Sequence, residues 1–308
     1  MYLKSLDVEK QQRDTKKFFE KTAKTWDHYS KKHSKKFLNI IKIRNDYVLD
    51  VVKKQLKKKS KTLDVGCGTG DLVIELENNG VDSIGIDFSQ SMIKKAKANA
   101  KKNKVNPKKF EQISFFDFKP EKKFDLISAN GFVEYISELE LEKFIEKSKK
   151  MINKNGILVF QIRNRLFNCF SLNDYTLNEI KIGEINHLLD ECVFFNNLKK
   201  FKELQTTKEK SKCKLNLKKH VKTGNEMTKI LVSKRLQYTP LQIIEILKRH
   251  NFKIIDINPI HIHPISTGGK NISPILHTKL SNFLQKEKKI KLTAIPLSSS
   301  VMITAKNE

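Results

Sequence analysis

Acids and glycines gather in one short stretch of the sequence, in a pattern suited to ligand binding. The segment "LDVGCGTG" places Asp64, Gly66, Gly68 and Gly70 within seven residues. Glycine is favoured where the backbone takes positive φ or approaches a ligand closely. Asp87 follows seventeen residues after Gly70, close to the spacing at which a carboxylate accepts hydrogen bonds from a ribose diol. The pattern predicts a turn that binds a molecule containing adenosine.

The position of Asp64 helps to choose among adenosine cofactors. The nicotinamide fingerprint has the form G-x-G-x-x-G, whereas here the glycines stand at 66, 68 and 70. An acid at the end of the preceding strand would repel a pyrophosphate and would suit the ammonium group of an amino-acid tail. We therefore expect adenosine joined to an amino-acid portion.

Alternating strand and helix patterns surround this turn and must position it. Apolar residues recur every three or four positions before residue 60, which indicates helices. From Lys61 to Asn164 short apolar runs alternate with helical segments, as in a parallel sheet whose ligands lie beyond the carboxyl ends of its strands. The expected strands are 61–67, 82–89, 110–118, 124–132, 156–162, 253–260 and 298–307, and the expected helices include 70–80, 89–103, 138–152 and 239–252.

These elements predict an α/β fold: a Rossmann-like, doubly wound, seven-stranded sheet with N-terminal helices and an inserted helical lid. Four segments are expected. They are a helical cover (1–60), a cofactor-binding core (61–164), an inserted lid or substrate segment (165–235), and a closing helix with strands that complete the sheet (236–308).

The chain resembles the class I S-adenosylmethionine-dependent methyltransferases, in particular the small-molecule branch. "LDVGCGTG" is similar to their first motif, "FFEKTAKTWDHYS" to their aromatic N-terminal helix, and "ISFFDF", "FDLISANGFVEYI" and "GILVFQI" to their later strands. The resemblance implies S-adenosyl-L-methionine as the cofactor. The cofactor-binding residues that it implies are Asp64, Gly66, Cys67, Gly68, Gly70, Asp87, Phe88, Met92, Asp117, Phe118 and Asn130.

Individual roles follow from the same resemblance. Asp64 would hold the ammonium group, Asp87 the ribose hydroxyls, and Asp117 would face the adenine amino group, with Phe88 beside the ring. Two structural alternatives stay open, namely Phe88 in the core and Asp117 as a cap. Many family members have a histidine where this chain has Tyr135, so a histidine base at that position is not expected.

Methyl transfer from a sulfonium needs mainly a well-placed nucleophile, and a base only where the nucleophile keeps a proton. The candidate catalytic residues are His28, Tyr29, Glu134 and Tyr135, and the candidate substrate residues are Trp26, Arg163 and Asn164. Surface exposure of His28 and helix capping by Glu134 are the competing interpretations.

The net charge of +27 admits two interpretations. Either the whole composition is biased toward lysine, or a polyanion binds; scarce arginine favours the first. The motifs of base methylation, an Asn/Asp-Pro-Pro-Tyr/Phe run or a cysteine beside proline, do not occur at the expected places, which disfavours nucleic acid. We expect methylation of an O or N atom of a small metabolite, with a sugar or surface-polysaccharide precursor suggested by "RNRLFNCFSLNDYT". An RNA methyltransferase using the lysine-rich segment 199–222, and a non-catalytic cofactor-binding protein, remain alternatives.

Metal sites, disulfides and membrane insertion are not expected. The four cysteines show neither close pairing nor ligand spacing with histidine. His261 and His263 alternate in "HIHP", but the sequence indicates no third ligand, so no metal is predicted. No apolar run is long enough to span a bilayer, and a cytoplasmic protein is expected. Nothing in the sequence predicts an oligomeric state.

Overall fold

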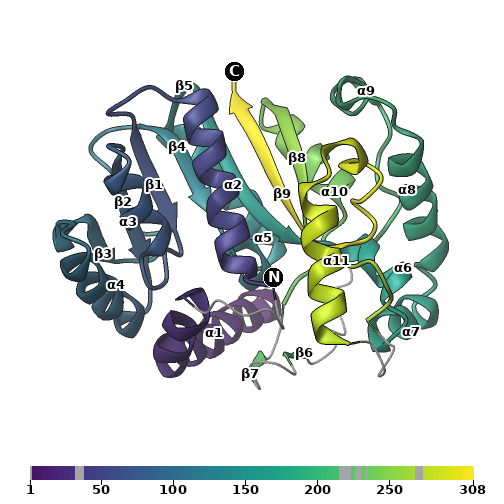
Figure 1. The fold of residues 1–308 in the computed structure, drawn as a ribbon, viewed down its shortest axis with the longest axis horizontal. Helices are drawn as coiled ribbons and strands as arrows, with labels where there is room; N and C mark the ends of the chain where they lie inside the picture. The colour runs from purple at the N-terminus through teal and green to yellow at the C-terminus, as the bar shows by residue number, and fades with distance from the viewer. Residues whose placement is uncertain (1, 32–37, 215–222, 226–229, 233–234, 268–272) are drawn as a thin grey trace.

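A seven-stranded sheet forms the centre of the molecule (Figure 1). The computed structural model describes residues 2–31, 38–214, 223–225, 230–232, 235–267 and 273–308. The strand order is β3-β2-β1-β4-β5-β9-β8, and β6 and β7 form a separate two-stranded sheet. The strands are β1 (Lys61–Val65), β2 (Asp82–Asp87), β3 (Phe110–Gln112), β4 (Phe124–Ala129), β5 (Ile152–Arg163), β6 (Thr223–Asn225), β7 (Ile230–Val232), β8 (Phe252–Ile262) and β9 (Ser298–Asn307).

The direction of the strands fixes where a ligand can bind. Strands β1 to β5 pair in parallel, and β9 lies antiparallel between β5 and β8. Strands β2 and β3 lie on one side of β1, and β4 and the later strands of this sheet lie on its other side. Because the strand order reverses between β1 and β4, the helices that follow these strands separate and leave a crevice at their carboxyl ends.

Helices cover both faces of the sheet. Valines of α2 pack with leucines of α3 against one face, and the apolar side of α5 packs with α10 against the other. The helices are α1 (Tyr2–Lys31), α2 (Ile40–Gln55), α3 (Asp71–Asn78), α4 (Gln90–Lys102), α5 (Glu138–Met151), α6 (Asn168–Ser171), α7 (Asp174–Lys181), α8 (Ile185–Asn197), α9 (Phe201–Thr206), α10 (Pro240–Arg249) and α11 (Pro274–Lys286), with 3-10 turns at Pro107–Lys109, Val133–Tyr135, Arg165–Phe167 and Lys288–Ile290. In the described part of the chain no helix is both long and apolar enough to cross a bilayer.

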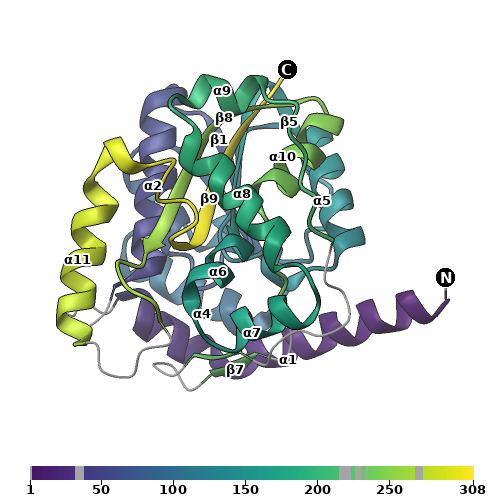
Figure 2. The same ribbon diagram turned by 90° about the vertical axis from the view of Figure 1, so that its right-hand side faces the viewer.

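Helix α1 lies beneath the carboxyl edge of the sheet instead of packing on a face (Figure 2). The Glu20 carboxylate accepts hydrogen bonds from the backbone N–H groups of Gln90 and Ser91, at 2.7 and 2.9 Å. These are free N–H groups of the first turn of α4, and an acid is favourable at that end of a helix. Gln11 donates to the Tyr135 carbonyl at 3.1 Å. Polar contacts therefore hold α1 across the crevice from α4 to the turn after β4.

The expected elements between residues 61 and 164 are present, with two large differences in length. Strand β5 begins at Ile152, four residues before the expected strand over 156–162. The strand expected over 110–118 ends at Gln112, and the chain then turns through residues 115–117. The side chains of Ser89 and Thr239 cap α4 and α10 by accepting hydrogen bonds from the backbone N–H groups of Met92 and Gln242. Helix α11 was not among the expected elements.

The segment expected as an inserted lid is largely helical. Helices α6 to α9 pack beside β8, β9 and α10, on the opposite side of the molecule from β3 (Figure 1). The expected lid segment ends at Arg235. The next residue, Leu236, lies beside the turn after β4 and donates its backbone N–H to the Glu134 carbonyl at 2.8 Å. Residues 215–222 of the lysine-rich tract lie outside the described residues.

Candidate active site

A cavity opens at the reversal point between β1 and β4. It has an empty volume of about 1210 Å³ including its mouth, and its walls come from α1, α2, the turns after β1, β2 and β4, and residues 113–116 after β3. It is therefore at the place where sheets of this topology bind ligands.

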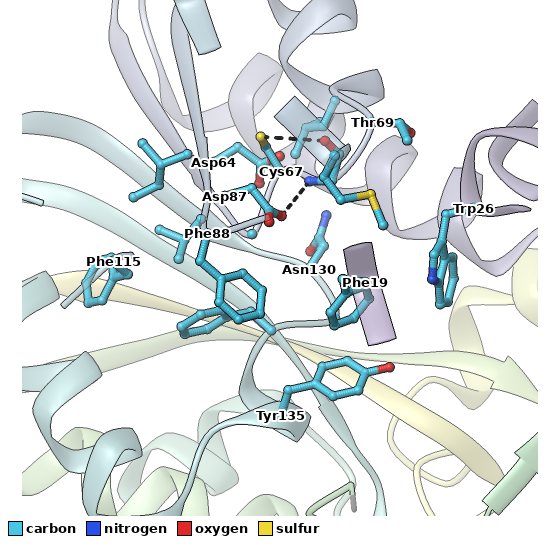
Figure 3. A pocket seen from close by; sticks show the side chains of 18 of the residues that line it. Phe19, Trp26, Asp64, Cys67, Thr69, Asp87, Phe88, Phe115, Asn130 and Tyr135 are labelled. Carbon is cyan, nitrogen blue, oxygen red and sulfur yellow. Dashed lines mark hydrogen bonds between the residues drawn. The ribbon is translucent and has the colours of Figure 1, made fainter. Parts of the chain in front are cut away.

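The glycine turn brings bare backbone to this cavity. Gly68 has φ of +52°, and its N–H donates to Asp87 Oδ2 at 3.1 Å (Figure 3). The other oxygen, Oδ1, accepts from Ser89 N–H at 2.9 Å. The N–H groups of Gly66 and Cys67 both donate to the Ile86 carbonyl. These bonds fix the turn against the end of β2 and orient the Asp87 carboxylate.

Two buried carboxyl groups lie at the inner end of the cavity. Burial raises the pKa of Asp64 to about 7, although a hydrogen bond from Ser128, at 2.7 Å, opposes the rise, and the charge of Asp87 adds to it. Burial likewise raises the pKa of Asp87 to about 6, against the hydrogen bonds from Ser89 and Gly68. Neither group has an ion-pair partner within the described residues. Both carboxyls would be stabilised as anions by a ligand that brings a positive charge or hydroxyl donors.

Aromatic side chains form the wall opposite the glycine turn. Phe19 of α1 lies between Phe88 and Trp26, with ring centroids 6.3 Å from each, and meets Tyr135 edge-on at 5.0 Å (Figure 3). The Trp26 Nε1 atom is buried without a hydrogen-bond partner. Apolar walls of this kind suit a planar ligand.

The side of the cavity near β4 and β5 is charged. Arg44 of α2 donates to Gln161 Oε1 at 2.7 Å and lies against Gly131. Gly131 has φ of +69°, and a Cβ there would come within 2.9 Å of Arg44 Nη1. Glu134 Oε2 is buried without a hydrogen-bond partner, 3.7 Å from Arg163 Nε.

Asn130, which follows β4, carries a third unpartnered atom of the cavity wall. Its Oδ1 is buried with no hydrogen bond, while its Nδ2 lies 3.4 Å from Asn45 Oδ1. Buried polar atoms normally have partners. The unpaired atoms of Trp26, Asn130 and Glu134 all lie on the cavity wall, so the walls fit a ligand that supplies both donors and acceptors.

Most of the residues predicted from the sequence come together here. The cavity is lined by Trp26, Asp64, Gly66, Cys67, Gly68, Asp87, Phe88, Met92, Asn130, Glu134 and Tyr135. Gly70 is adjacent to the cavity but not on its wall. A Cβ at Gly70 would come within 2.7 Å of the Phe110 ring, so this glycine serves packing of the turn.

Two predicted cofactor-binding residues lie outside the cavity wall. Asp117 is exposed and Phe118 is buried in the core, and neither lines the cavity. The cause is the early end of β3, because the turn through residues 115–117 presents Ile113, Ser114, Phe115 and Phe116 to the cavity in their place.

The structure also separates some expected catalytic and substrate residues from the cavity. His28 is exposed and stacks edge-on with Tyr29, and neither lines the wall. Asn164 is fully buried and donates to the carbonyls of Ile295 and Ser298, which is a structural role. Arg163 does not line the cavity wall, and it contacts the site through Glu134.

Apart from Trp26, the residues that helices α1 and α2 contribute were not predicted from the sequence. Gln12, Thr15, Phe19, Arg44 and Asn45 all line the cavity. The composition of the chain could have indicated Arg44. Only six of the sixty-one basic residues are arginines, so an arginine in a helix whose other basic residues are lysines is a candidate for a specific role.

Comparisons with known proteins agree with this geometry. Residues 56–235 match the family model described as "Methyltransferase domain". The chain is 31% identical over 183 residues to the ubiquinone biosynthesis O-methyltransferase of Pelagibacter ubique, which covers 56% of this chain and 74% of that protein. It is 34% identical over 118 residues to the carboxy-S-adenosyl-L-methionine synthase of Nautilia profundicola, covering 36% of this chain and 47% of that protein.

A solved structure supports the fold over nearly the whole length. Magnesium protoporphyrin IX methyltransferase from Synechocystis PCC 6803, with bound S-adenosylmethionine, superposes with a TM-score of 0.54 and 12% identity, covering 97% of each chain.

Proposed function

Because the chain belongs to the methyltransferase-domain family and uses S-adenosylmethionine as its cofactor, we propose that it methylates an oxygen atom of a small planar molecule that carries an acidic group. The observation that carries this proposal is the wall of the cavity, which combines an aromatic face, the Glu134 Oε2 atom, which makes no hydrogen bond, and the guanidinium of Arg44.

The cofactor is assigned to the inner half of the cavity. Asp87 would accept hydrogen bonds from the ribose hydroxyls, and Asp64 would face the ammonium group of the methionine portion. Asn130 Oδ1, which lacks a partner, would point toward the sulfonium side. Bound S-adenosylmethionine supplies a methyl group on a positively charged sulfur, and the protein's task is to position the acceptor in line with it.

Glu134 is the proposed base. Its Oε2 atom is buried on the cavity wall and makes no hydrogen bond, so it can accept the proton of an acceptor hydroxyl. Tyr135 is a poorer base, because burial and the neighbouring Glu134 raise the pKa of its phenol well above the ordinary value. Tyr135 would instead pack against the acceptor, as it packs against Phe19.

An acidic group on the acceptor is supported by a concentration of arginine. Half of the chain's six arginines, Arg44, Arg163 and Arg235, act electrostatically on Tyr135. Arg163 is 3.7 Å from the Glu134 carboxylate, and Arg235 hydrogen-bonds to Tyr135. Three guanidinium groups around one carboxylate leave a surplus of positive charge, which an anionic acceptor would balance.

A sugar acceptor is less well supported. The stretch "RNRLFNCFSLNDYT" that suggested it contributes nothing to the cavity wall. Arg165 is buried and pairs with Glu179 at 2.7 Å, and Leu166 and Phe167 belong to the core. The names of the relatives favour oxygen as the acceptor atom, since one is an O-methyltransferase of ubiquinone biosynthesis.

Transfer of a labelled methyl group tests the proposal. Purified protein with methyl-labelled S-adenosylmethionine is incubated with a panel of hydroxybenzoates, the matching phenols without a carboxylate, sugar nucleotides and transcribed RNA. We expect incorporation into hydroxybenzoates, with a higher KM for the phenols that lack the acid. Incorporation only into RNA, or cofactor binding with no transfer to any class, would overturn the proposal and favour the RNA enzyme or the non-catalytic protein.

Two variants locate the chemistry. Glu134→Gln keeps the shape of the side chain and removes the base, so we expect kcat to fall by about 100-fold with little change in cofactor affinity. Glu179→Gln, far from the cavity wall, alters a buried carboxylate of the Arg165 pair and controls for losses of stability.

A further inference from the structure

Three histidines converge at the same edge of the sheet as the cavity but outside its wall. His261 and His263 come from the end of β8, and His277 comes from α11. One ring nitrogen of each histidine lies within 4.8 Å of one ring nitrogen of each of the other two. Among the described residues, these three histidines form the cluster whose side chains could bind a metal ion. The sequence alone gave no third ligand, because fourteen residues separate His277 from His263.

We propose that His261, His263 and His277 bind one divalent transition-metal ion, with zinc the best fit. Three imidazoles leave one position of a tetrahedral zinc open for water or another small donor. Imidazole without carboxylate suits zinc, copper, nickel or iron, and argues against magnesium and calcium, which require oxygen ligands.

The spacing of the nitrogens fits one shared ion. His263 Nδ1 and His277 Nε2 are 3.1 Å apart. Two nitrogens bound to one zinc at about 2.0–2.1 Å with tetrahedral angles lie about 3.4 Å apart. These two nitrogens would therefore need to move apart by only a few tenths of an ångström to share the ion.

Helix α11 is fastened to β8 by the same face that carries His277. Ser281 donates to the Ile262 carbonyl at 2.6 Å, and Gln285 donates to the Pro259 carbonyl at 2.7 Å. His277, Ser281 and Gln285 stand four residues apart, so they share one side of the helix. The position of His277 is thus fixed by the packing of the helix and not by a loop.

The surroundings of the histidines resemble the supporting contacts of metal sites. Ser299 Oγ lies 3.2 Å from His261 Nδ1, and such contacts orient a ligand ring. The Phe167 ring stacks on His263, with centroids 4.5 Å apart.

The backbone at the cluster is also unusual. His261 has φ of +57°, a conformation that side chains other than glycine rarely adopt and that concentrates at functional sites.

Metal titration of the full, untagged chain tests the inference. After treatment with chelator, Co²⁺ or Zn²⁺ is added, and bound metal is measured by a competing chromophoric chelator and by the visible absorption of Co²⁺. We expect one ion per chain and a cobalt spectrum typical of four- or five-coordinate nitrogen ligation. Absence of stoichiometric binding, or a spectrum of hexaaqua cobalt only, would overturn the inference.

Ligand variants distinguish this site from surface binding. His277→Ala should weaken Zn²⁺ binding by about 100-fold or more, whereas His187→Ala, which removes a half-exposed histidine elsewhere, should leave it unchanged. Because the cluster does not line the cavity, His277→Ala should retain the wild-type affinity for S-adenosylmethionine, which also shows that the variant is folded. Equal zinc affinity in the two variants would contradict the assignment.

Discussion

Affinity for S-adenosylmethionine should fall steeply as the pH is lowered from 7.5 to 5.5. Burial raises the pKa of Asp64 to about 7 and that of Asp87 to about 6. Because these values lie above the ordinary value of 3.8, the free protein holds protons that a free carboxylate would release. If the cofactor binds only the carboxylate forms, each proton must leave on binding, so low pH opposes binding.

The magnitude follows from the two pKa values. When the pH falls from 7.5 to 5.5, protonation of Asp64 should raise the dissociation constant of the cofactor about 25-fold, and protonation of Asp87 about 4-fold. Together they give about 100-fold, or about 2.7 kcal/mol of binding free energy. At pH 6.5 about one proton should leave per cofactor bound. Trp26 is the single tryptophan of the chain and lines the cavity, so its fluorescence can report binding directly.

Calorimetry in buffers of different ionisation enthalpy counts the released protons independently. Ser128→Ala removes the hydrogen bond that lowers the pKa of Asp64, and should move the pH profile to higher pH. Thr62 lies on β1 with Asp64, but its buried hydroxyl donates to Ser83 and not to Asp64. Thr62→Ala should therefore leave the pH profile unchanged. A dissociation constant that is equal at pH 5.5 and 7.5, with no proton release, would refute the reasoning.

Three further outcomes are expected. Asp87→Asn should weaken cofactor binding by at least about 10-fold because it removes a charged acceptor, whereas Asp117→Asn should bind like the wild type in the same fluorescence titration; a loss in Asp117→Asn would mean that this exposed acid reaches the cofactor after all. Gly131→Ala should raise the KM of the acceptor and lower the free energy of unfolding by about 1–2 kcal/mol, since a Cβ would meet Arg44 at 2.9 Å. Gly183 also has a positive φ, of +77°, but has open space around it, so Gly183→Ala should affect only stability. Equal KM values in the two variants would count against the acceptor role of Arg44. Glu20→Ala should increase the dissociation rate of the cofactor several-fold in stopped-flow fluorescence by releasing α1 from α4; an unchanged rate would show that α1 does not hold the cofactor in place.

The sequence was most informative where one short stretch carries a whole substructure. The glycines and Asp87 lie on consecutive elements, and their spacing reflects a strand, a turn and a helix that fold locally. Asp117 lies outside the cavity wall, and the sequence could not show this because a strand of unknown length precedes the residue. Phe110 to Gln112 pair with β2 and the next residues turn away, and the apolar run "FF" gives no sign of where pairing ends.

Contacts between segments that are distant in the sequence could not be predicted from it. Arg44 meets the site only because α2 packs beside β5 and bonds to Gln161, 117 residues later. Glu20 reaches α4 across seventy residues, and nothing in the sequence pairs the two. The same holds for His277, whose approach to His263 depends on the packing of a helix that the sequence pattern did not reveal.

Helix α1 has a consequence for the timing of turnover. It covers the crevice through polar contacts of Glu20, Gln11 and Asp27, the last of which bonds to Asn99 and Lys95 of α4. If spent S-adenosylhomocysteine leaves only after α1 moves away from the cavity, the opening rate of α1 sets an upper limit on kcat, however fast the methyl group is transferred.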